Sequence, residues 1–125
     1  SSGSRLSASN ANLSNGGMDG VTVLYNSTAN LYDANISGCG GLGLYVVEGS
    51  VVNADQAYLV NNGFGGILNH SSFVSANSAN TRVYGTSDSP EDMGVTGGGI
   101  ISAPGALGGT NITKNTLTPN GIIFG

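Results

Sequence analysis

A regularly spaced repeat of eight residues constrains the fold of this chain more than any other feature. Four octapeptides align without gaps, each beginning with Ser and ending with Ala, and their first residues lie 23, 23 and 22 positions apart. The four segments are 4–11, 27–34, 50–57 and 72–79. The third and fifth positions are apolar in every copy, as with Val52 and Ala54, which is the alternation of a strand with one buried face. One structural unit is therefore expected to recur along the chain.

Each octapeptide is followed by two further apolar runs that are separated by a tight corner. The second runs place Leu13, Ile36 and Leu59 at one equivalent position. The third runs begin at Gly20, Gly43 and Gly66. Short segments of Gly and Asn stand between the second and third runs, and both residues adopt the positive φ of a tight corner at low cost. Three short strands and three corners are therefore expected in every repeat.

A unit of three short strands in 22 or 23 residues is typical of one coil of a parallel β-solenoid. No run shows a helical apolar period long enough for the crossovers of a doubly wound sheet. The pattern of leucine-rich repeats is absent, and the unit is too short for a propeller blade. We predict an all-β fold, a right-handed, single-chain parallel β-helix over residues 1–85 that forms the C-terminal end of a longer solenoid.

Composition limits the partners of such a solenoid. Charged residues make up 8% of the chain, and 3 basic against 7 acidic residues give a net charge of −4. This balance provides no cationic surface for nucleic acid, and no apolar run approaches the about 18 residues of a membrane span. The single cysteine, Cys39, excludes an internal disulfide framework. Leu, Ile, Val and Phe form about a quarter of the chain, which argues against disorder.

The repeat is lost after Tyr84 and Gly85, so residues 86–125 are predicted to form a separate loop and a short C-terminal β segment. Its apolar residues lie in Gly-rich stretches that are too short to form a core of their own. We expect them either to cap the open end of the solenoid or to meet copies of themselves in a homotrimer. The candidate trimer-interface residues are Ile100, Ile101, Leu117, Ile122, Ile123 and Phe124.

These features together resemble the distal part of bacteriophage tailspike and tail-fibre proteins. The resemblance rests on the Ser-x-Val-x-Ala-x-x-Ala coils, the Gly-rich corners and the terminal Asn-Thr-Leu-Thr-Pro-Asn-Gly-Ile-Ile-Phe of residues 115–124, and it covers the whole chain. Pectate-lyase-like enzymes share the coil pattern. The resemblance implies a homotrimer of parallel β-helices on the virion, facing outward, that binds and often cleaves bacterial surface polysaccharide. Such cleavage usually resides in a longer β-helix body, so enzymatic activity is not assigned to this chain.

Glycoside hydrolysis requires two carboxyl groups roughly 5–9.5 Å apart. Asp33 and Asp55 fall one position apart in consecutive coils near the same corner, so they are a candidate pair. The simpler interpretation is that both are solvated corner residues, and no catalytic residue is assigned.

A second candidate group depends on where the third coil loses one residue. If the loss falls before Ser71, then Tyr25, Glu48 and His70 stack at one outer corner. A phenol, a carboxylate and an imidazole there would bind a sugar or share acid–base chemistry, with Glu48 as a further catalytic carboxylate. Tyr45, outward on the third strand, would extend this glycan-binding surface or pack against a neighbouring chain. The alternative is that these are unrelated exposed residues.

The loop that follows the repeat carries Asp88, Glu91 and Asp92, whose oxygens are the ligands that hard cations prefer. The spacing of an EF-hand is absent, and a solvated loop is the simpler interpretation. We therefore predict no metal and no cofactor.

Three functions remain open for the chain. The first is a structural, receptor-facing virion module, the trimeric end of a phage tailspike or fibre that contacts host polysaccharide. The second is a fragment of a polysaccharide depolymerase, either a glycosidase or a lyase. The third is a secreted bacterial β-helix adhesin, which would be monomeric. The oligomeric state separates the third function from the other two.

Overall fold

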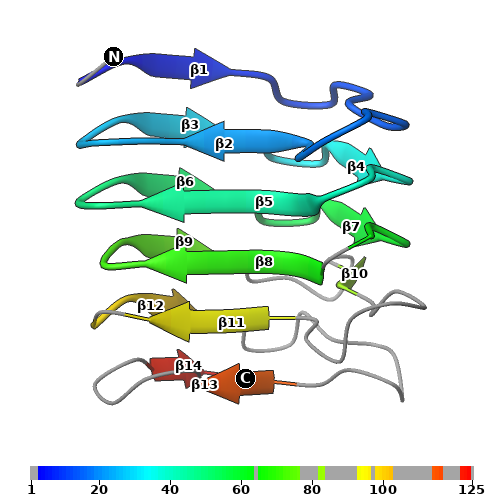
Figure 1. Ribbon diagram of the computed structural model, residues 1–125. Helices are drawn as coiled ribbons and strands as arrows, with labels where there is room; N and C mark the ends of the chain where they lie inside the picture. Colours follow the sequence, from blue (N-terminus) through cyan, green and yellow to red (C-terminus); the bar gives the residue numbers. More distant parts are fainter. Residues whose placement is uncertain are drawn as a thin grey trace.

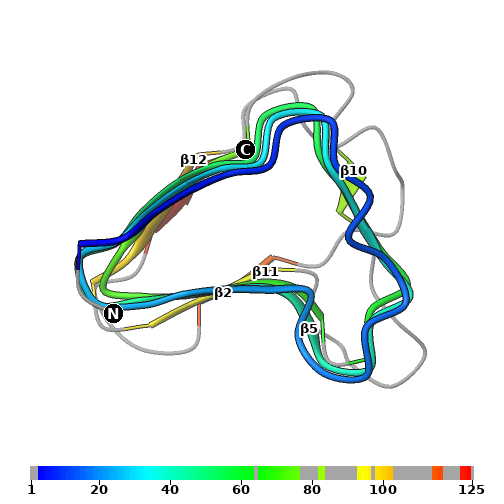
Figure 2. The same cartoon turned by 90° about the horizontal axis from the view of Figure 1, so that it is seen from above.

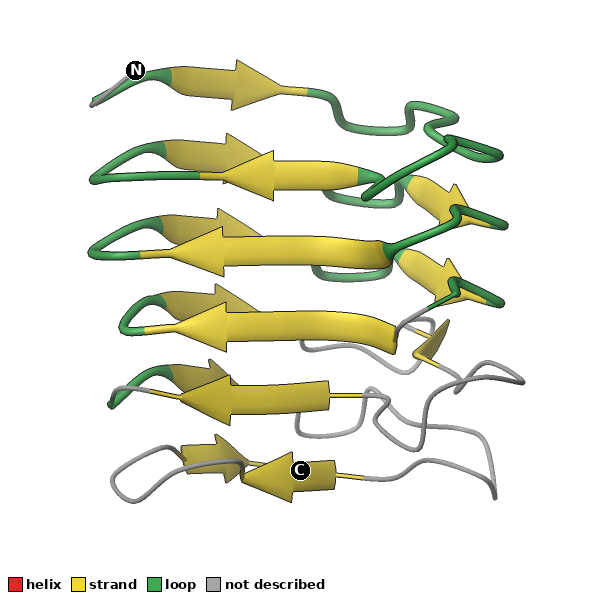
Figure 3. Ribbon diagram, viewed as in Figure 1, coloured by secondary structure: helices red, strands yellow, loops and turns green. Residues whose placement is uncertain are grey.

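The protein is described by a computed structural model in which short strands stack in levels, one coil below another (Figures 1 and 3). The described residues are 3–63, 65–76, 82–83, 93–96, 98–102, 114–116 and 122–124. Strands are the only regular elements among them. Seen from above, the successive coils lie over one another along one axis (Figure 2).

Three parallel sheets form the faces of the stack. Sheet A contains β1 (Arg5–Ser7), β3 (Thr28–Asn30), β6 (Val51–Asn53), β9 (Phe73–Ser75), β12 (Ile100–Ser102) and β14 (Ile122–Phe124). Sheet B contains β4 (Asn35–Ser37), β7 (Tyr58–Val60) and β10 (Arg82–Val83). Sheet C contains β2 (Val21–Val23), β5 (Leu42–Val47), β8 (Gly65–His70), β11 (Met93–Thr96) and β13 (Lys114–Thr116). Every pairing among these strands is parallel, which confirms the predicted all-β parallel solenoid.

The register of the octapeptides agrees with the sequence alignment residue for residue. Leu6 pairs with Ala29, Ala29 with Val52, and Val52 with Val74 in sheet A. The fifth position of the octapeptide is also inward, and Ala54 is fully buried. The core therefore consists of columns of apolar side chains that run down the axis, each residue packing on its equivalent in the next coil.

A buried serine ladder explains why each octapeptide begins with Ser. The main-chain N–H of Ser27 donates to Oγ of Ser50 at 3.3 Å, and that of Ser50 donates to Oγ of Ser72 at 3.1 Å. The hydroxyls themselves donate to backbone oxygens, that of Ser50 to Val47 and that of Ser72 to His70. Serine thus satisfies buried polar groups at the corner between sheets C and A, where an apolar residue would leave an N–H unpaired.

The corners adopt positive φ, as the Gly and Asn content predicts. Asn15, Gly38 and Asn61 occupy one such corner with φ of 62°, 66° and 56°. Larger residues also adopt this conformation: Tyr25 and Glu48 both have φ of 48° at the corner between sheets C and A. For these L-residues the left-handed region costs about 1–2 kcal/mol, so the interactions between coils outweigh a local preference.

The strands of residues 93–124 extend the same sheets. β11 pairs with β8, and β12 pairs with β9. β13 then pairs with β11, and β14 pairs with β12. Ile101 pairs with Val74 and is fully buried, so it continues an inward column. This differs from the separate segment that the sequence predicts after residue 85. The regular spacing and the initial Ser end there, but the inward apolar positions that hold the stack do not.

Candidate functional site

Tyr25 and Glu48 lie at the same corner in consecutive coils, as predicted. The N–H of Tyr25 donates to Val47 O at 3.1 Å, and the N–H of Glu48 donates to His70 O at 2.9 Å. Both side chains are exposed, Tyr25 by 50%. The pair presents a phenol and a carboxylate one coil apart, a combination suited to binding a polar, ring-shaped ligand.

His70 does not join this column, because the one-residue loss falls later than the prediction requires. His70 is the last residue of β8, where it pairs with Val47 at the full spacing of 23 residues. The corner position is taken by Ser71, which has φ of 54°. Two residues with positive φ, Glu48 and Gly49, make the corner above, and one makes this corner. The imidazole therefore lies on sheet C beside the corner.

Tyr45 lies on the strand that leads into this corner. It pairs with Thr22 on one side and Leu68 on the other, and it is half-buried on the outer face of sheet C. Its neighbours along β5, Leu44 and Val46, are fully buried, which fixes the outward direction of the phenol. The glycan-binding role of Tyr45 remains a prediction.

Asp33 and Asp55 are neighbours across one coil spacing. The N–H of Asp33 donates to Asp55 O at 3.0 Å. Oδ1 of Asp55 accepts a hydrogen bond of 2.7 Å from Oγ of Ser75, and its N–H donates to Oδ1 of Asn53 at 3.0 Å. Asp55 is thus built into the polar ladder on sheet A, while Asp33 is an exposed residue with φ of 56°. One carboxyl group is fixed by its partners, and the other is open to solvent.

The predicted cation loop cannot be placed. Asp88, Glu91 and Asp92 lie outside the described residues. Within the part of the chain that the structure does describe, no group of three or more His, Cys, Asp or Glu residues is arranged to hold a metal ion.

The trimer-interface candidates fall into three sets. Ile101 is buried in the core of its own chain, whereas Ile100 is half-buried on the outer face of sheet A. Ile122, Ile123 and Phe124 form β14 beside β12. Leu117 lies outside the described residues.

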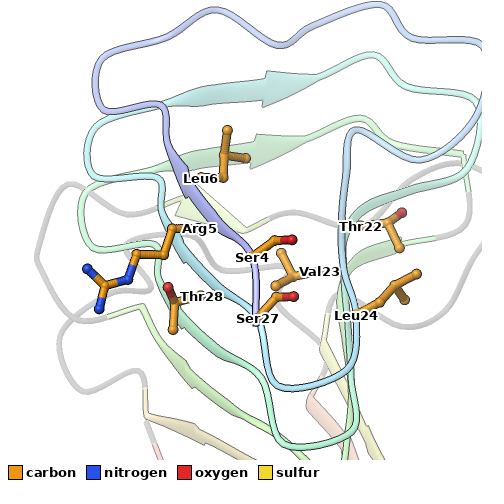
Figure 4. A pocket seen from close by; sticks show the side chains of 8 residues that line it. All are labelled: Ser4, Arg5, Leu6, Thr22, Val23, Leu24, Ser27 and Thr28. Carbon is orange, nitrogen blue, oxygen red and sulfur yellow. The ribbon is translucent and has the colours of Figure 1, made fainter. Parts of the chain in front are cut away.

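A pocket of about 170 Å³ opens at the N-terminal end of the stack, between sheets A and C (Figure 4). Its lining residues are Ser4, Arg5, Leu6, Thr22, Val23, Leu24, Ser27 and Thr28. Leu6 is 44% exposed although its equivalents in the next coils are buried, so the pocket is the uncovered end of the core. The lining offers no carboxylate, imidazole or thiol. Its volume is also below the roughly 300 Å³ of typical ligand sites.

A broader and shallower hollow of about 420 Å³ lies over the outer face of sheet A. It is lined by Arg5, Leu6, Ser7, Thr28, Ala29, Asn30, Val51 and Asn53. The hollow has the size of a ligand site, but Arg5 is the one charged residue in its lining. It offers hydrogen-bonding groups and no acid–base pair.

The sequence predicts Asn at the tight corners, but the structure also buries two asparagines in the core. Asn62 accepts from the N–H of Cys39 at 3.0 Å and donates to Ile36 O at 3.1 Å. Asn69 takes the inward position of Val46 in the next coil; its Nδ2 donates to two backbone oxygens, and its Oδ1 is buried without a hydrogen-bond partner. The equivalence of Asn69 with Val46 was the signal for its inward position.

The sequence analysis also did not predict an apolar column on the outer face of sheet A. Val51, Phe73 and Ile100 are paired in register on sheet A and lie on its outer face. The second position of the octapeptides, which passes from Arg5 and Thr28 to Val51 and Phe73, is the signal that would have revealed it.

Comparison with known proteins identifies no relative: no family model, no curated protein and no solved structure matches this chain. Within the described ranges, no helix is long and apolar enough to span a membrane.

Proposed function

We propose that the chain is a structural and receptor-facing virion module, the trimeric distal end of a bacteriophage tailspike or tail fibre that contacts host surface polysaccharide. The observation that carries the proposal is the unbroken sheet A, in which six strands from β1 to β14 stack in parallel register. Such a stack is a stiff column with short corners, as an attachment organelle requires. The resemblance of the coils and of the terminal segment to tailspike proteins supports the same function.

The proposal includes a right-handed coil with a closed C-terminal end. In Figure 2 the chain runs clockwise as it descends from the N-terminal coil, a course that supports the right-handed turn. Parallel connections in a sheet are right-handed in almost all proteins. β13 and β14 lie at the C-terminal edges of sheets C and A, where a capping segment would protect the strands above from open-ended association.

The test is the mass of the chain in solution, measured by light scattering on a sizing column over a range of concentrations. A mass of three chains that persists on dilution supports the spike module. A monomer at every concentration contradicts the trimer and favours the adhesin. Retention of labelled bacterial surface polysaccharide by the trimer tests the receptor-facing role, and it should weaken on the replacement Tyr25→Ala, which removes the exposed phenol beside Glu48.

A depolymerase fragment is the second candidate, because Asp33 and Asp55 are joined through their main chains across one coil spacing. If these carboxyl groups act on a glycosidic bond, the chain should release reducing ends from polysaccharide, and both Asp33→Asn and Asp55→Asn should abolish the release. Cleavage that survives both replacements would remove this pair from consideration.

A further inference from the structure

The hollow over the outer face of sheet A is framed by polar side chains from two neighbouring strands. Arg5 of β1 pairs with Thr28 of β3, and both side chains lie on the side of the sheet that faces away from Val23 (Figure 4). Ser7 pairs with Asn30 two residues further along the same strands, and all four polar residues are exposed. Neighbouring strands are about 4.8 Å apart and alternate residues of one strand about 6.6 Å apart, so the four groups frame an area that one sugar ring covers.

The amide of Asn30 is oriented so that it donates to whatever occupies the hollow. Its Oδ1 accepts from the N–H of Tyr32 at 3.2 Å and from Nδ2 of Asn53 at 3.3 Å. Asn53 is oriented in turn, because its own Oδ1 accepts from the N–H of Asp55 at 3.0 Å. A main-chain N–H only donates, so these bonds define which end of each amide is the oxygen. Both lone pairs of the Asn30 oxygen are used, and its Nδ2 is the group that remains for a ligand.

The charge of the lining favours a ligand that is negatively charged. Arg5 is the one charged residue in the lining, and its guanidinium has five N–H donors and no acceptor. No other side chain that the structure describes on the three sheets is basic. Asp33 and Asp55 lie beyond the ends of β3 and β6 and do not line the hollow. The chain has a net charge of −4, but the Debye length of about 8 Å at physiological salt makes the groups nearest to a ligand decisive.

The rest of the lining suits the uncharged parts of a sugar. The hydroxyls of Ser7 and Thr28 both donate and accept, as the hydroxyls of a sugar do. Val51 follows Thr28 in the same outward column and is 47% exposed, so it offers an apolar surface to the C–H face of a ring. The volume of about 420 Å³ lies within the range of ligand sites.

We propose that this hollow binds a sugar residue that carries a carboxylate, within an acidic polysaccharide, and that Arg5 and Asn30 are its main donors. A guanidinium pairs with a carboxylate through two parallel hydrogen bonds. Nδ2 of Asn30 donates to an oxygen of the same sugar. This inference rests on the receptor-facing role of the proposed function and names the chemical class of the ligand. Its site is a different surface from the corner of Tyr25 and Glu48.

The test is a titration of the isotope-labelled chain with two probes, followed by NMR. One probe is an oligogalacturonate, which has a carboxylate on every ring, and the other is an uncharged dextran oligosaccharide of the same length. The side-chain signals of Arg5 Nε and Asn30 Nδ2 should shift with the oligogalacturonate and not with dextran. The affinity should fall as the salt concentration rises, because the contact is partly electrostatic.

Asn30→Asp is the first variant, because a carboxylate still accepts from Tyr32 and Asn53. The replacement turns the donor into a negative charge, so the fold should persist while binding of the oligogalacturonate is lost. Asn35→Asp is the matched control. It adds the same charge on sheet B and retains the oxygen that accepts from Ser37, so it should bind as the wild type does. Circular dichroism and thermal unfolding of each variant establish that the solenoid is intact.

Arg5→Gln is the second variant, and it keeps the test decisive if Asn30→Asp does not fold, because position 5 is exposed on β1. It should weaken binding at least about fivefold. No shift of the Arg5 and Asn30 signals with the oligogalacturonate would overturn the proposal. Dextran bound as tightly as the oligogalacturonate would also overturn it, as would equal losses in Asn30→Asp and Asn35→Asp.

A second measurement separates this inference from the proposed function. If the intact chain retains bacterial surface polysaccharide and both hollow variants, Asn30→Asp and Arg5→Gln, retain it equally, the hollow is overturned and the receptor-facing role stands. If the wild-type chain retains no bacterial polysaccharide and binds neither probe, the receptor-facing role and the hollow are both overturned. The mass of the chain in solution tests the trimer independently of either result.

Discussion

Sheet A passes through two regions of different sequence, and their comparison shows what holds the solenoid together. Between residues 4 and 79 the strands belong to octapeptides that share Ser, Ala and two inward apolar positions. In the tail, the segment of β12 keeps only part of this pattern, without its initial Ser, and β14 keeps less, yet both strands continue the sheet in the same parallel register. The common elements are main-chain hydrogen bonds and an inward column through Val74 and Ile101. A coil is therefore defined by its inward positions more than by its repeat.

The two regions also differ at the corner between sheets C and A. In the coils, Tyr25, Glu48 and Ser71 have positive φ although each has a Cβ, whereas in the tail the described residue with positive φ is Gly98, at 79°, in the position that Gly49 takes in the coil of Glu48. Glycine adopts this conformation without strain. The coils thus carry strained residues at this corner, and the serine ladder that supports the coils lies beside them.

The largest expected effect lies in the repeated region. The replacement Val52→Asp places an unpaired charge at a fully buried position and should prevent folding. Soluble yield and far-ultraviolet circular dichroism measure the outcome. Thr28→Asp, at an exposed position on β3, is the matched control and should retain the fold. A Val52→Asp protein with normal unfolding would refute the inward column.

A core truncation in the tail tests whether this region is part of the same stack. Ile101→Ala should destabilise the protein by about 2–5 kcal/mol, because it leaves a cavity at a fully buried site. Urea unfolding followed by circular dichroism gives this value. If the coils unfold at an unchanged urea midpoint, the tail is an independent unit and is not part of the same stack.

The serine ladder should contribute less than either core position. Ser50→Ala leaves the buried N–H of Ser27 without its acceptor and should cost about 1–2 kcal/mol. The same urea experiment applies, with Ser7→Ala as the control on an exposed position of β1. Equal stability of both variants would mean that water accepts the hydrogen bond of the Ser27 N–H in place of the Ser50 hydroxyl.

The smallest effects concern the corner, where removing a Cβ at positive φ and adding one should have opposite effects. Glu48→Gly should raise stability by about 0.5–1 kcal/mol, because it relieves positive φ at a residue with a Cβ. Gly98→Ala should lower stability by about 1 kcal/mol for the converse reason. Thermal unfolding of both variants beside the wild type measures the shifts. Changes of the same sign would contradict the assignment of strain to residues that have a Cβ at positive φ.

The sequence was sufficient for the parts of the fold that repeat. The Ser and Ala positions gave the register of β1, β3, β6 and β9 directly, since one spacing places every inward side chain. The continuation into the tail is harder to predict, because residues 99–106 keep the apolar third position at Ile101 and Ala at the fifth and eighth positions, but begin with Gly and lie 27 residues after the preceding octapeptide. A sequence repeat marks the regular coils, but a strand can join the stack when it has an apolar residue at the inward position.

The candidate site was predicted in part for a similar reason. The neighbouring positions of Tyr25 and Glu48, and of Asp33 and Asp55, follow from the spacing of the coils. The place of His70 does not, because the coil that loses a residue could lose it on either side of the two adjacent serines, Ser71 and Ser72. In the structure Ser72 continues the serine ladder by accepting a hydrogen bond from the N–H of Ser50. This bond fixes Ser72 as the equivalent of Ser50, so the residue is lost at the corner between His70 and Ser72.

The direction of the main-chain hydrogen bonds has a mechanical consequence. In all three sheets these bonds join one coil to the next, so they point along the axis of the column. A tensile force between the two ends loads the bonds of the terminal coil first and is expected to peel the coils off in sequence. Each coil of 22 or 23 residues would lengthen the chain by about 75–80 Å. A force–extension trace would then be a series of steps of about this size, with a longer step where paired residues lie 27 positions apart, as Phe73 and Ile100 do. A single all-or-none rupture would contradict sequential peeling.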